Sequence, residues 1–134
     1  MTPHRLLATL LASAAVASCA QTPPAPAASA PEAESARLAR ELQTLIGPAA
    51  CSADTQCRSL AVGAKACGGP AGYLAWSTVG TDAERVADLA ARQSGAQKRE
   101  IAASGMRSNC VFVADPGAAC VAGRCELVTN ASAR

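Results

Sequence analysis

The sequence predicts an α+β fold: a small domain held together by disulfides, in which a short antiparallel sheet of about three strands is covered by one helix. Six cysteines lie between residues 51 and 125, an even number that is typical of a disulfide framework. Large apolar side chains are few, and the chain has one Trp, one Tyr and one Phe. Such a sparse core needs covalent support. Helical periodicity alternates with short apolar runs, which is the pattern of a mixed fold.

The first 18 residues have the parts of an export signal. His4 and Arg5 supply a basic start, residues 6–16 form an apolar run, and Ala17 and Ser18 are small enough for a peptidase cleft. The apolar run ends after roughly a dozen residues, whereas a membrane-spanning helix needs about 20. We therefore predict that residues 1–18 are a removable signal peptide.

The junction Val16-Ala17-Ser18-Cys19 resembles the lipobox of bacterial lipoprotein precursors. The resemblance implies that Cys19 receives a diacylglyceryl group, becomes the first residue after cleavage and is then N-acylated. Several acyl chains hold a protein far more firmly than one. In such lipoproteins an aspartate after the cysteine is associated with inner-membrane retention, and Ala20 in its place implies the outer membrane. The alternative is a plain secretory signal in which Cys19 is incidental.

Residues 19–31 are predicted to be the lipidated cysteine and a Pro/Ala-rich linker. The segment contains four prolines among alanine and serine, so it cannot bury a core and favours extended polyproline II geometry. It would hold the following domain away from the membrane. A ligand for a proline-binding module is the alternative interpretation.

Residues 32–47 are predicted to form an amphipathic helix. Leu38, Leu42, Leu45 and Ile46 recur on one helical face, and Gly47-Pro48 ends the pattern. Such a helix either covers the domain or forms a coiled stalk. The alternative is a docking face for a partner.

Residues 48–134 are predicted to form the six-cysteine domain. Its cysteines, once Cys19 is taken by lipid, are Cys51, Cys57, Cys67, Cys110, Cys120 and Cys125. An exported chain meets oxidants, so three disulfides are expected. Six cysteines allow 15 connectivities. Cys67 with Cys110 is preferred, because these two bracket a predicted helix, and the other four are left to join within or across their close pairs. Zinc is disfavoured because no Cys-x-x-Cys motif occurs and the mature chain has no histidine.

Three short strands are predicted in this domain. Residues 60–62 form the first, residues 110–113 the second and residues 126–129 the third. Asp115-Pro116-Gly117 is a strong turn signal, and residues 121–124 are turn-like, so the last two strands would form a long hairpin.

A helix is predicted over residues 82–104, between the first two strands. Thr81 and Glu84 have the spacing of a capping box, and Gly105 marks the end. Its buried side is expected to contain Val86, Leu89, Ala90 and Ile101.

The stretch from Cys67 to Ser77 is the candidate binding loop. It combines a glycine-rich turn with the chain's single Tyr and Trp, and the residues proposed for binding are Gly68, Gly69, Pro70, Tyr73 and Trp76. The two rings, three residues apart, would face the same way on a helical turn. The alternative is that both rings fill the core and the glycines merely turn the chain.

Composition limits the function classes. The formal charge is +2 and falls to +1 once Arg5 is removed, and no basic run with interleaved aromatics is present, so nucleic acid is not an expected partner. The glycines match neither a phosphate-binding loop nor a dinucleotide fingerprint, and no cofactor is expected. A Ser-Lys pair is formally available through Lys65 with Ser59 or Ser77, but no spacing singles out a catalytic residue.

These observations favour a membrane-anchored envelope lipoprotein with a non-enzymatic binding or structural domain, whose partners are the membrane, through its lipid, and an unidentified envelope protein or ligand. The pattern from Cys51 to Cys125 resembles small six-cysteine domains of uncharacterised bacterial lipoproteins, a resemblance that implies no activity. A protease-inhibitor-like domain that presents residues 69–76 is the alternative function, and an enzyme is disfavoured.

Overall fold

The computed structural model describes residues 32–128. The elements in chain order are α1 (Glu34–Ile46), the 3-10 turn η1 (Asp54–Gln56), β1 (Cys57–Val62), β2 (Gly72–Ser77), α2 (Ala83–Ser104), β3 (Ala118–Val121) and β4 (Arg124–Leu127). The predicted α+β class is confirmed. The predicted signal peptide, Cys19, the predicted linker and residues 129–134 lie outside the described residues.

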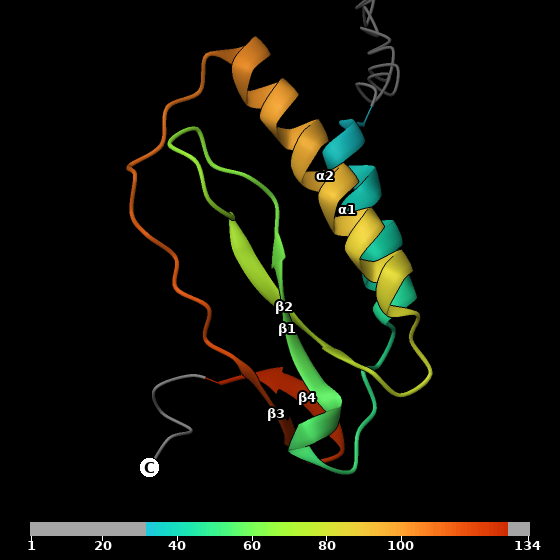
Figure 1. Ribbon diagram of the computed structural model, residues 1–134. Coiled ribbons are helices and arrows are strands. Elements are labelled where there is room, and N and C mark those ends of the chain that lie inside the picture. The colour runs from blue at the N-terminus through green and yellow to red at the C-terminus, as the bar shows by residue number, and fades with distance from the viewer. Residues whose placement is uncertain (1–31, 129–134) are drawn as a thin grey trace, which may run out of the picture. The chain divides into compact units, whose positions relative to one another are not determined.

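The two helices lie side by side and run in opposite directions (Figure 1). The helix predicted for residues 32–47 is α1, and Gly47 ends it with φ +57° and an amide that donates to the carbonyl of Gln43. The helix predicted for residues 82–104 is α2. Its N-cap is Asp82, whose carboxylate accepts the amides of Glu84 and Arg85, so the predicted capping box of Thr81 with Glu84 is wrong.

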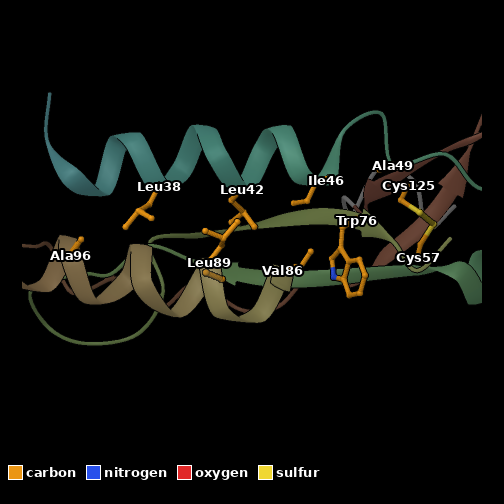
Figure 2. Close-up of a cluster of buried hydrophobic side chains, with 11 residues drawn as sticks. Leu38, Leu42, Ile46, Ala49, Cys57, Trp76, Val86, Leu89, Ala96 and Cys125 are labelled. Atoms are coloured by element: carbon orange, nitrogen blue, oxygen red, sulfur yellow. A yellow bond between two sulfur atoms is a disulfide. The ribbon is translucent and has the colours of Figure 1, made fainter. Parts of the chain in front are cut away.

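The apolar core lies between the helices and continues toward the sheets (Figure 2). Leu38 and Leu42 of α1 have no exposed surface, and Leu89 of α2 is 2 % exposed. Both helices therefore pack into the core with the faces that were predicted to be buried. Ile101 was expected on the buried side of α2 and is only half-buried. Because α1 shares its core with α2, this helix covers the domain and is not a free stalk.

The start of α1 is bound to the last turns of α2. The amide of Ser35 donates to the Glu100 carboxylate at 2.9 Å, and the Ser35 hydroxyl donates to its second oxygen. The hydroxyl, followed by the amide, holds the pKa of Glu100 below its usual range. Arg99 pairs with Glu34 at 2.9 Å. The chain therefore enters the domain beside the C-terminal end of α2.

β1 and β2 form an antiparallel hairpin in which Cys57 lies opposite Ser77 and Val62 opposite Gly72. β1 contains the predicted residues 60–62, but β2 occupies residues that were expected to be a loop with a helical turn. On a strand, residues three apart point to opposite faces. Tyr73 and Trp76 therefore cannot face the same way.

The second sheet is the hairpin of β3 and β4, joined by Ala122 and Gly123 with φ of +48° and +82°. Positive φ at both central positions is what a two-residue hairpin turn of type I′ requires. The turn predicted at residues 121–124 is confirmed, but β3 replaces residues 110–113 as the partner strand. Residues 110–113 form no strand, so the structure has two two-stranded sheets where one three-stranded sheet was expected.

The three predicted disulfides are present. They join Cys51 to Cys120, Cys57 to Cys125 and Cys67 to Cys110. The preferred pair is thus found, and the other four cysteines join across their close pairs. Cys120 and Cys125 lie opposite each other in the β3–β4 hairpin. Two disulfides therefore attach this one pair of positions to Cys51 and Cys57, just before and at the start of β1. Neither helix within residues 32–128 is long and apolar enough to cross a bilayer.

Candidate functional site

The residues of the predicted binding loop separate into two groups. Gly68, Gly69 and Pro70 lie in the connection between β1 and β2, where both glycines are exposed. Trp76 is 8 % exposed and belongs to the core, beside Val86 and the Cys57–Cys125 disulfide (Figure 2). For Trp76 the core alternative therefore holds, and the structure does not bring it together with the glycines.

Tyr73 is half-buried on β2 and lies opposite Ala61 in the ladder. Because Gly72–Ser77 is a paired strand, most of the 69–76 segment considered as an inhibitor loop is held in the sheet. Residues 69–71 are the part of the segment that lies outside the strand.

The start of the β1–β2 connection is fixed to α2 by two glutamines. The Gln93 side-chain oxygen accepts the Gly63 amide at 3.1 Å, and that of Gln97 accepts the Ala64 amide at 3.0 Å. At the far side of the connection, the Ala71 amide donates to the Val62 carbonyl. These bonds satisfy backbone groups that would otherwise lack partners, so the connection has a defined shape.

Gly63→Ala should destabilise the domain by roughly 2 to 3 kcal/mol, because Gly63 has φ +69° and its hydrogen faces α2. An added Cβ would lie 2.6 Å from the Gln97 side-chain oxygen and 2.8 Å from the Ala71 Cβ. The matched control is Gly69→Ala, at φ +77° with nothing within 4 Å, which should lose roughly 1 kcal/mol for backbone strain alone. Urea denaturation of both variants measures the difference, and equal losses would contradict the close packing at Gly63.

A long irregular connection between α2 and β3 runs beside this loop. The Cys67–Cys110 disulfide links the two, and the Lys65 ammonium donates to the Val111 carbonyl. Further along, the Ser59 hydroxyl donates to Asp115 at 2.9 Å and, with the Gly117 amide, holds the pKa of that carboxyl below its usual range. The connection is therefore held at several points although it has no regular structure.

This connection displays the most exposed apolar side chains of the described chain. Phe112, the single phenylalanine, is 85 % exposed, and Met106 and Val111 are 59 % and 58 % exposed. The exposure of Val111 and Phe112 was not foreseen, because residues 110–113 were predicted to be a strand of the sheet. We call the following residues the tip surface: Lys65, Gly68, Gly69, Pro70, Met106, Arg107, Val111 and Phe112.

Two shallow clefts lie in the tip surface. One, of about 310 Å³, is lined by the glycine-rich loop and by residues 110–113. The other, of about 350 Å³, lies between the 64–66 stretch, the end of α2 and residues 106–109. Lys65 lines both clefts, Arg107 lines the second, and neither lining includes a carboxylate. The tip surface is thus apolar and basic.

The residues considered for catalysis or metal binding have other partners in the structure. Lys65 bonds to a backbone carbonyl, Ser59 bonds to Asp115, and Ser77 is fully buried and accepts the Val79 amide. The sulfurs of three cysteines lie within 4.8 Å of one another, namely Cys51, Cys57 and Cys125. Each of them is oxidised in a disulfide, and a metal ligand must be a thiolate.

No protein family model, curated protein or solved structure matches this chain. A rigid, exposed surface with apolar and cationic side chains is suited to binding another surface.

Proposed function

We propose that the chain is an exported bacterial lipoprotein, anchored at the outer membrane through lipid on Cys19, whose disulfide domain binds without catalysing a reaction. The single observation that carries the proposal is the use of the cysteines. Of seven in the chain, six are consumed by three disulfides, and Cys19 is the seventh. Disulfides persist in oxidising compartments. The junction Val16-Ala17-Ser18-Cys19 resembles a lipobox, and this resemblance assigns the remaining cysteine to a lipid.

The fold supports the binding part of this proposal. The disulfides and the packed helix pair hold the domain together. The core contains no residue of the tip surface, and Phe112 and Met106 are exposed to solvent. A displayed apolar cluster on a small domain marks an interaction site. The function we propose is therefore presentation of the tip surface at the cell envelope.

Cys19→Ala should move the protein from the membrane fraction to the soluble or unprocessed fraction, because the acylated sulfur is its anchor. The matched control is Gln21→Ala, two residues away, which should fractionate as the unchanged protein does. Intact mass of the membrane-extracted protein should show loss of residues 1–18, addition of acyl chains, and a gain of two hydrogens for each of the three disulfides on reduction. If Cys19→Ala is cleaved and fractionates just as the unchanged protein does, Cys19 is not the anchor and the proposal is overturned; two cleaved, soluble proteins would favour the plain secretory signal.

A further inference from the structure

We propose that the tip surface docks onto the anionic phospholipid surface of the same membrane to which Cys19 is anchored. This inference rests on the proposed function, since it takes the lipid anchor as given. It adds a second contact, made by the folded domain itself, so that the domain lies against the bilayer instead of extending from it.

The apolar side chains of the tip surface suit the interfacial region of a bilayer. Phe112 is 85 % exposed, and Met106 and Val111 are each more than half exposed, on one irregular connection. Insertion of such side chains among lipid headgroups removes apolar area from water. The connection is fixed by the Cys67–Cys110 disulfide and by the bond from Lys65 to the Val111 carbonyl, so little conformational entropy is lost on docking.

Charge favours a lipid surface of the opposite sign. Lys65 and Arg107 line the clefts of the tip surface, and Lys98 lines an adjoining groove of about 390 Å³ between β1 and α2. None of these three cations forms an ion pair within residues 32–128. A Lys or Arg close to an anionic bilayer is attracted by its negative surface potential.

The position at which the chain enters the domain places the tip surface within reach of the membrane. Glu34 and Ser35, at the start of α1, are bonded to Arg99 and Glu100 near the end of α2. Gln97 and Ile101, from the same turns of α2, line the larger cleft of the tip surface. Twelve residues lie between Cys19 and Glu32, and a chain of that length can span at most roughly 43 Å.

The tether also makes weak docking sufficient. A linked surface is presented at an effective concentration that an untethered domain would not reach, so an intrinsically weak contact is populated once the anchor is inserted. The opposite end of the helix pair lies about 33 Å away, the length of the 22 residues of α2. That end, which carries Val79, is expected to remain in water.

The test uses the complete acylated protein, extracted from membranes and reconstituted in vesicles of phosphatidylethanolamine and phosphatidylglycerol with brominated acyl chains. Phe112→Trp places a fluorophore on the tip surface, and Val79→Trp, at a position that is 55 % exposed, is the matched control. The unchanged protein, whose single tryptophan is Trp76, is measured in the same vesicles, and its emission is subtracted from that of each variant. The tryptophan at 112 should lose at least about half of its emission to the brominated lipid, whereas the one at 79 should keep its emission. Removal of phosphatidylglycerol should weaken the quenching.

The outcomes separate the two proposals. If intact mass shows acyl chains but the tryptophan at 112 is quenched no more than the one at 79, lipid docking is overturned and the lipoprotein assignment stands. If the emission at 112 shifts only in native envelope membranes, the occupant is a protein and lipid docking is likewise overturned. If the extracted chain carries no acyl group, the proposed function itself fails.

Discussion

Replacing Cys57 and Cys125 together by alanine should lower the free energy of unfolding by roughly 4 to 5 kcal/mol. The Cys51–Cys120 disulfide remains, so the removed bond closes an effective loop of only about a dozen residues, worth roughly 3 kcal/mol of chain entropy. The rest comes from packing, because Cys57 and Cys125 are 4 % and 7 % exposed and lie in the core with Trp76. The total free energy of unfolding of a small domain is about 5 to 15 kcal/mol, so the variant should be close to unfolding at 37 °C. Guanidinium titration followed by Trp76 fluorescence gives the value.

The matched control is the variant with Cys51 and Cys120 replaced by alanine. The Cys51–Cys120 disulfide has a sequence separation of 69 and the Cys57–Cys125 disulfide one of 68, and both join the same two parts of the chain. The two variants therefore lose nearly the same chain entropy of the unfolded state. Cys51 and Cys120 are only half-buried, and this variant should lose roughly 3 kcal/mol. A larger loss in the control than in the Cys57 and Cys125 variant would show that the buried disulfide has no packing role.

Leu42→Ala should cost about 3 kcal/mol, because the side chain is fully buried between α1 and α2 and its removal leaves a cavity. The matched control is Leu45→Ala on the same helix, where the side chain is half-buried at the edge of the core and about 1 kcal/mol should be lost. Urea denaturation by circular dichroism measures both variants. A single cooperative transition shifted by the expected amount requires α1 to fold with the rest of the domain. Equal, small losses would instead mean that α1 is a separate stalk.

The helices could be predicted from the sequence because their signals are local. Leu38 and Leu42 recur at helical spacing, and Gly47 and Gly105 end their helices with positive φ. The number of disulfides followed from an even count of cysteines. The choice of Asp82 over Thr81 as N-cap could not be made, since adjacent residues of similar capping propensity differ only in backbone geometry.

The strands were predicted less well because their pairing depends on residues far apart in the chain. Residues 110–113 have high β propensity, yet the Cys67–Cys110 disulfide and a Cys110 φ of +56° hold them in an irregular connection. β3 contains two alanines and was missed for the opposite reason, because tertiary context gives it a partner that its propensity does not indicate. The same error hid the candidate site, since Phe112 was assigned to a strand and is instead exposed.

All three native disulfides join cysteines separated by 43 residues or more, and each pairs one of the first three cysteines with one of the last three. If the chain is exported as proposed, its first three disulfide cysteines reach the oxidant before their native partners have left the translocation channel. Any bond made at that moment is an error. Maturation along that route would require either that oxidation wait for the complete polypeptide or that a thiol isomerase rearrange the early disulfides.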